Sequence, residues 1–243
     1  MEYGLQMFSV RDMTEKDLEG AIRAVAALGY RYIEYAGFFG HDAQTVANWQ
    51  EAYGVKCSGT HSGWVELRPE SIEETIRYHK TIGNPNYIIP GADLSTLEKI
   101  DEFCAVMNAA KPRLEAGGIR LGYHNHSHEF VVMPWGSTIH SELEKRCDCD
   151  FEIDTYWAFN AGLDPIQVLD RLADRIRVIH LKDGFRGGRG MALGEGEAPV
   201  AAVRKKAIEM GILMVVESES LTPDGISEVG RCMDFLRKCD AAD

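Results

Sequence analysis

Residues 149–183 read CDFEIDTYWAFNAGLDPIQVLDRLADRIRVIHLKD. Two short runs rich in apolar and β-branched residues, CDFEID and IRVIHLKD, enclose a segment with the spacing of amphipathic helix. Two consecutive strands joined through a helix need a crossover connection, so they lie parallel in one sheet. This stretch therefore predicts a strand–helix–strand unit.

The same unit recurs along the whole chain. A helical pattern follows each of eight strand candidates, at residues 4–10, 30–37, 55–62, 86–91, 119–126, 149–154, 176–183 and 212–220. Eight parallel strands favour a closed (β/α)8 TIM barrel over a doubly wound sheet. No strand is followed by the Gly-x-Gly-x-x-Gly turn that seats a dinucleotide. We expect an α/β protein with a single barrel domain over residues 1–243.

Glycines punctuate this pattern. Five of them stand just ahead of a strand, where a helix commonly ends in the left-handed conformation: Gly29, Gly54, Gly83, Gly118 and Gly211. The segment GFRGGRGMALGEGE, residues 184–197, follows the seventh strand, and we interpret it as a mobile active-site loop.

Composition limits the classes of function. The formal net charge of -12 argues against nucleic acid as a partner, because neutralising phosphates needs a basic face. No apolar stretch approaches the roughly 20 residues of a membrane span, and the N-terminus lacks the features of a signal peptide. The six scattered cysteines are expected to be reduced and structural. We expect a cytoplasmic protein, and the sequence leaves open whether it forms a homo-oligomer.

Three polar residues stand where apolar strands end. Asp154 follows FEI, His180 follows RVI and Glu217 follows LMVV. The C-terminal strand ends of a parallel barrel form its active face, and a carboxylate buried there is costly unless it meets a cation. The set predicts a divalent metal site. The alternative is ordinary ion pairing with Lys182, Arg175 or Arg189.

A fourth ligand is expected from YHNHSHEF, residues 123–130. His124 and His126 alternate along the strand and share one face, whereas Glu129 lies just past the strand end. Glu129 would complete an oxygen-rich set suited to manganese or magnesium, and His124 or His126 would favour zinc, iron or cobalt. We predict Glu129 as the fourth ligand.

Other strand ends carry side chains suited to a hydroxyl-rich ligand. Candidates for polar contacts with a substrate are Gln6, Arg11, Glu34, His61 and His124. Aromatic side chains such as Trp157, Trp64 and Phe38 could stack on a sugar ring, although each could equally pack in the core or a loop. Lys182 faces the same way as His180 and could stabilise an oxyanion or neutralise the carboxylates.

Several motifs together resemble a known family. GLQMFSVRD, YIEYAG, LGYHNHSHEF, FEIDTYW, VIHLKD and LGEGE follow, in order, the pattern of the xylose-isomerase-like barrel proteins, or sugar phosphate isomerases/epimerases, which include inosose dehydratases and tagatose 3-epimerase relatives. The resemblance implies a divalent ion, often manganese, held by glutamate, aspartate, histidine and glutamate, and its matching positions are Asp154, His180 and Glu217. In the epimerase branch, glutamate stands at His124 and histidine at Trp157. The chain is more similar to the HNH-x-x-EF branch, which resembles enzymes that eliminate across 3-keto sugars.

These observations predict a metal-dependent sugar isomerase or epimerase acting on a ketose or keto-sugar, with manganese as the expected ion and magnesium, zinc, cobalt or iron as alternatives. Glu217 would remove the proton beside the carbonyl, and His126 or Glu129 would return it or protonate a departing hydroxyl. Lys182 is the further catalytic candidate. A lyase or dehydratase acting on an inosose or a 3-keto glycoside is the first alternative, and a non-catalytic sugar-binding barrel is the second.

Overall fold

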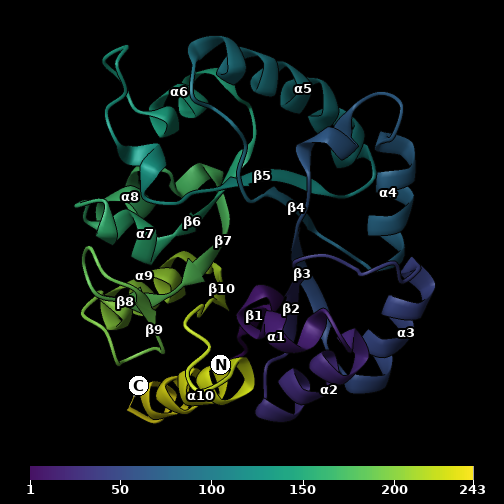
Figure 1. The fold of residues 1–243 in the computed structure, drawn as a ribbon, viewed down its shortest axis with the longest axis vertical. Coiled ribbons are helices and arrows are strands. Elements are labelled where there is room, and N and C mark those ends of the chain that lie inside the picture. The colour runs from purple at the N-terminus through teal and green to yellow at the C-terminus, as the bar shows by residue number, and fades with distance from the viewer. Residues whose placement is uncertain (243) are drawn as a thin grey trace.

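A closed barrel of eight parallel strands forms the centre of the structure, a computed structural model that describes residues 1–242 (Figure 1). The barrel strands are β1 Gly4–Gln6, β2 Tyr32–Tyr35, β3 Lys56–His61, β4 Asn86–Ile89, β5 Arg120–His124, β6 Asp150–Asp154, β7 Ile176–Leu181 and β10 Leu213–Val216. Each strand pairs with its neighbours in sequence, and β10 pairs with β1 to close the ring. The predicted (β/α)8 barrel is confirmed.

Helices surround the strands on the outside of the barrel (Figure 1). They are α1 Arg11–Thr14, α2 Leu18–Leu28, α3 Ala43–Tyr53, α4 Ile72–Thr81, α5 Leu97–Ala116, α6 Ile139–Arg146, α7 Thr155–Asn160, α8 Pro165–Arg171, α9 Val200–Met210 and α10 Gly225–Ala242. Short 3-10 helices are η1 Met7–Val10, η2 Trp64–Leu67, η3 His128–Phe130 and η4 Ala173–Arg175. None of the helices in residues 1–242 is both long and apolar enough to cross a membrane.

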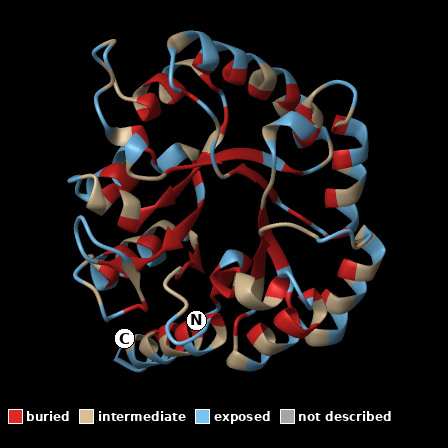
Figure 2. Ribbon diagram, in the orientation of Figure 1, coloured by how far each residue is buried: buried red, intermediate tan, exposed pale blue. Residues whose placement is uncertain are grey.

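The core lies in the strands and on the inward faces of the helices (Figure 2). Amphipathic helices such as α2 place one apolar face on the sheet, and its Ile22 and Val25 are fully buried. All five glycines predicted to end helices have a left-handed backbone. At Gly29, φ is 106°, a conformation that is strained for residues with a Cβ atom.

Residues 7–10 differ from the prediction. They were expected to extend the first strand but form η1 instead. The side-chain oxygen of Gln6 accepts a hydrogen bond from the Phe8 backbone N–H at 3.0 Å, which caps the first turn of η1 where the strand ends. Phe8 consequently reaches the active-site face.

A buried carboxylate organises residues 184–198. Asp183 Oδ1 accepts from the backbone N–H groups of Gly184 and Ala198, and its Oδ2 accepts from those of Gly194 and Gly196. A Cβ atom at Gly196 would lie 2.3 Å from Asp183 Oδ1, so this close approach requires glycine. The segment interpreted as a mobile loop contains the small antiparallel hairpin of β8 Asp183–Gly184 and β9 Gly190–Met191. Its mobility stays a prediction.

Replacing Asp183 with alanine should loosen this segment, because four N–H groups lose their acceptor at once. We expect faster amide hydrogen exchange in residues 184–198 and a loss of stability of ~3 kcal/mol or more. Exchange mass spectrometry and urea unfolding would measure both. Asp174→Ala, at an exposed aspartate of η4, is the matched control. Unchanged exchange in Asp183→Ala would show that the carboxylate does not hold the segment.

Candidate active site

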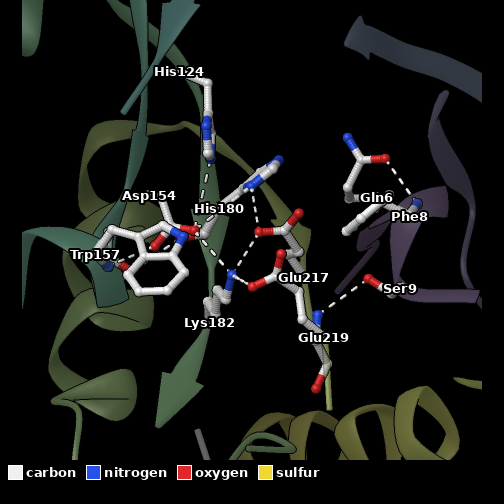
Figure 3. Close-up of polar contacts among 12 residues, drawn as sticks. Gln6, Phe8, Ser9, His124, Asp154, Trp157, His180, Lys182, Glu217 and Glu219 are labelled. Carbon is white, nitrogen blue, oxygen red and sulfur yellow. Dashed lines mark hydrogen bonds and ion pairs between the residues drawn. The ribbon is translucent and has the colours of Figure 1, made fainter. Parts of the chain in front are cut away.

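Four buried side chains meet at the C-terminal ends of four neighbouring strands: His124 of β5, Asp154 of β6, His180 of β7 and Glu217 directly after β10 (Figure 3). Strand register brings them together, because Asp154 pairs with His180 across the sheet. Asp154 Oδ2 lies 3.7 Å from His124 Nε2 and 3.8 Å from His180 Nδ1. His180 Nδ1 lies 3.4 Å from Glu217 Oε2.

The donor atoms of this group suit a metal ion. Both ring nitrogens of His124, Asp154 Oδ2 and His180 Nδ1 are buried without a hydrogen-bond partner, which is costly for protein polar atoms. Metal–ligand bonds of about 2.0–2.2 Å place neighbouring ligand atoms about 3–3.7 Å apart, close to the observed separations. Two imidazoles and two carboxylates are a donor set that zinc, manganese, iron or cobalt accepts. The residues therefore fit a divalent ion.

Lys182 supplies positive charge to the same group. Its Nζ lies 2.9 Å from Glu217 Oε2, contacts Glu219 Oε2, and is 3.8 Å from Asp154 Oδ2. It also lies 4.5 Å from the centre of the Trp157 ring (Figure 3). These contacts place the Lys182 charge among three carboxylates.

Burial and neighbouring charges set the protonation of these groups. Burial raises the pKa of Asp154 to about 7, against the opposing effect of Lys182. Burial also acts to raise the pKa of Glu217, but Lys182 and His180 hold it well below its usual range. Burial lowers the pKa of His124, and His180 reinforces this. Glu217 is therefore ionised and His124 neutral, the forms in which both side chains bind metals.

A second layer of polar residues lies deeper in the barrel and fixes His180. His180 Nε2 is 2.6 Å from Glu34 Oε2 and 3.3 Å from Glu152 Oε2. Glu34 also accepts a hydrogen bond from the Gln6 amide, and His61 lies 2.7 Å from Glu152. Burial acts to lower the pKa of His180, but Glu152, Glu217 and Glu34 raise it well above its usual value. An ion bound at Nδ1 would therefore displace a proton, while the Nε2 N–H that donates to Glu34 keeps Nδ1 turned toward the other donors.

This layer changes the expected roles of two residues. Gln6 and Glu34 were predicted to contact substrate, but both are fully buried and occupied with each other and with His180. Arg11, a third candidate, donates to the backbone oxygens of Phe8 and Glu219. Gln6 and Glu34 thus hold the His180 ring, and Arg11 holds the backbone at Phe8 and Glu219.

Glu129 lies apart from the expected metal group. The short helix η3 turns its carboxylate back, so that Oε1 accepts from the Tyr123 hydroxyl at 2.9 Å and Oε2 from the His126 backbone N–H at 2.8 Å. It forms a separate group with His126 and His128. His124, the alternative that the sequence left open, takes the fourth place beside Asp154.

A cavity of roughly 300 Å³ adjoins this group through two of its members, His124 and Glu217. Its lining comprises Phe8, Ala36, His61, Pro90, His124, His126, Glu217 and Glu219. The predicted site residues His61, His124, His126 and Glu217 thus reach it. Trp157 is not part of the lining, and its ring instead covers Lys182.

Two buried or cavity-lining glutamates were missed. Glu152 alternates with Asp154 along β6, so the spacing places both on the inward face and could have identified it. Glu219 stands two residues after Glu217 in the same irregular segment. The strand predicted over residues 212–220 would place Glu219 on the same face as Glu217, so alternation could have identified it, although β10 ends at Val216.

Comparison with known proteins agrees with this architecture. A family model described as xylose isomerase-like TIM barrel matches residues 22–239. A sugar phosphate isomerase/epimerase from Parabacteroides distasonis is 25% identical, with a TM-score of 0.82 and 98% of each chain covered. An L-ribulose 3-epimerase is 16% identical, with a TM-score of 0.73 over 98% of this chain and 94% of the other. A probable 3-DHS dehydratase from Bacillus anthracis is 12% identical, with a TM-score of 0.74 over 98% and 99%. No curated protein matches the chain in sequence.

The donor group predicts which substitutions weaken metal binding. His124→Gln and Asp154→Asn should each weaken binding of Mn²⁺ by ~100-fold or more, since even outer-shell partners are worth 10–100-fold. Glu129→Gln is the matched variant and should bind normally. Isothermal titration calorimetry would measure the affinities, with circular dichroism to check folding. Loss of binding in folded Glu129→Gln alone would restore Glu129 as the ligand.

Proposed function

The chain belongs to the xylose isomerase-like TIM barrel family, and we propose that it is a divalent-metal-dependent isomerase or epimerase of a ketose or keto-sugar. The convergence of four buried donor side chains beside an open cavity carries this proposal. Three of the donors, His124, Asp154 and His180, have buried atoms without a hydrogen-bond partner. Such an arrangement is costly in a folded protein unless a ligand compensates it.

In the proposal, His124, Asp154, His180 and Glu217 hold the ion. Manganese is the metal that the family resemblance implies, and His124 in place of Glu129 makes the donor set equally suited to zinc, iron or cobalt. A bound divalent ion would act as a Lewis acid on the carbonyl and neighbouring hydroxyl of the sugar, acidifying the adjacent C–H. The proton transfers would be carried out by side chains that line the cavity.

Glu217 is the proposed general base. It lines the cavity, and its low pKa keeps it ionised, so it can accept the proton from the carbon beside the carbonyl. The hydrogen bond from Lys182 to Glu217 Oε2 at 2.9 Å orients the carboxylate. Lys182 thereby acts as a positioning residue.

His126 is the proposed partner for the second proton transfer. It also lines the cavity, whereas Glu129, the other candidate, is held by Tyr123 and by the His126 backbone. Burial lowers the pKa of His126, so the free imidazole is neutral and would have to take up a proton, from solvent or from a substrate hydroxyl, before it delivers one. Phe8 and Pro90 supply apolar wall for the carbon face of a sugar.

Elimination is the second candidate reaction. A proton delivered by His126 to a departing hydroxyl, instead of to carbon, would turn the same site into a lyase or dehydratase. The likeness to the probable 3-DHS dehydratase supports this alternative at the level of the fold. An inosose or a 3-keto glycoside would be the substrate.

Solvent deuterium exchange tests the proposal directly. Proton NMR of the Mn²⁺-loaded protein in heavy water, with ketoses, inososes and 3-keto glycosides, should show loss of the signal beside the carbonyl. Glu217→Gln should slow this exchange by ~10³-fold or more, because the base is removed. Glu70→Gln, at an exposed glutamate, is the control and should exchange normally.

The products separate the candidates. Exchange without elimination indicates an isomerase or epimerase, and appearance of an enone or a released group indicates a lyase. A protein that binds Mn²⁺ and sugar but exchanges no proton would be a non-catalytic sugar-binding barrel. Undiminished exchange in Glu217→Gln would refute the role of Glu217.

A further inference from the structure

A second cavity, of roughly 560 Å³, lies beside the active-site cavity. It is formed by the segments that follow β2 and β3 and by α4. Ala36 and His61 line both cavities, so the two adjoin at these residues. A ligand held beside the four donor side chains could therefore continue past Ala36 into the second cavity.

We propose that this second cavity binds a hydroxyl-rich, uncharged substituent of the substrate, such as a second sugar ring. The substrate would then be a keto-sugar carrying a glycosyl group, and not a phosphorylated monosaccharide. This inference rests on the proposed function, since it assumes that the first cavity holds a keto-sugar.

One wall of the second cavity is a rigid aromatic surface. Phe38 packs against Tyr35, Tyr78 and His79, with ring centres 5.3, 4.6 and 5.9 Å apart. These contacts hold a half-buried ring at the edge of the cavity. Preorganised aromatic faces of this kind stack on the apolar face of a sugar ring at little entropic cost.

The polar groups of the lining are mainly hydrogen-bond acceptors. Glu66 Oε2 accepts from the Tyr87 hydroxyl at 3.0 Å, and its Oε1 can accept from a ligand. The Tyr78 hydroxyl donates to the His41 backbone oxygen at 2.8 Å, which leaves its own oxygen as an acceptor. Sugar hydroxyls, which donate readily, match such a lining.

Charge argues against a phosphate in either cavity. Glu66 and Glu74 line the second cavity and Glu217 and Glu219 the first, and within residues 1–242 no lysine or arginine lines either one. The nearby cation Arg77 pairs with Glu74 at 3.1 Å on the exposed side of α4. A phosphate group would meet like charges without a compensating donor.

Matched pairs of sugars test the inference. Isothermal titration calorimetry with Mn²⁺-loaded protein would compare fructose with maltulose, and 3-keto-glucose with 3-keto-trehalose, with fructose 6-phosphate as the charged probe. In at least one pair, the disaccharide should bind ~10-fold more tightly than its monosaccharide, the value of one stacked ring. Fructose 6-phosphate should bind no better than fructose.

Substitutions in the second cavity test whether its aromatic wall causes the preference for disaccharides. Phe38→Ala should reduce the ratio of disaccharide to monosaccharide affinity by ~10-fold. Phe39→Ala is the matched control, because Phe39 is exposed beside Phe38 and does not line the cavity. Glu66→Gln, with Glu70→Gln as its control, should lower the same ratio through the weaker acceptor.

The outcomes distinguish this inference from the proposed function. Disaccharide preference that depends on Phe38, without any proton exchange, would support the second site and refute the isomerase. Proton exchange without any disaccharide preference, or a preference for fructose 6-phosphate, would refute the second site alone. A disaccharide preference unaffected by Phe38→Ala would also refute it.

Discussion

Burial of many ionisable groups at one end of the barrel is the constraint on which the rest of the structure depends. The fully or almost fully buried carboxylates of Glu34, Glu152, Asp154 and Glu217 share this end with only a few compensating groups. Desolvating each carboxylate costs several kcal/mol, so each must find a cation, a hydrogen bond or a bound ion. Their partners are the half-buried His61 and the buried His180 and Lys182.

His180 connects the two layers of this network. One ring nitrogen faces Glu34 and Glu152, and the other faces Asp154 and Glu217. The deeper carboxylates therefore determine which nitrogen is available above, and the closed ring of strands keeps both layers in register. Gln6 serves both the fold and the site. Its side-chain oxygen accepts the Phe8 N–H where β1 ends, and its side-chain nitrogen donates to Glu34.

The sequence predicted features that follow from regular periods. Apolar runs and helix-ending glycines located all eight strands, and polar residues at strand ends brought Asp154, His180 and Glu217 together. It grouped Glu129 with these residues, but Glu129 lies beyond the strand, where no period applies, and the short helix η3 turns its carboxylate to Tyr123. The deeper role of Glu34 depends on three-dimensional packing that alternation alone does not reveal.

The net charge of the metal-loaded site bears on whether the substrate is charged or neutral. The carboxylates of Asp154, Glu217 and Glu219 surround the Lys182 ammonium group. A divalent ion bound beside Lys182 would bring the local positive charge to three, equal to the negative charge of the three carboxylates in their ionised form. Ion binding favours the ionised form of Asp154, whose pKa burial otherwise raises to about 7. The loaded site would then be close to neutral, with no surplus positive charge to attract a phosphate. Uncharged sugars, recognised by shape, stacking and hydroxyl contacts, suit such an environment better than anionic ones.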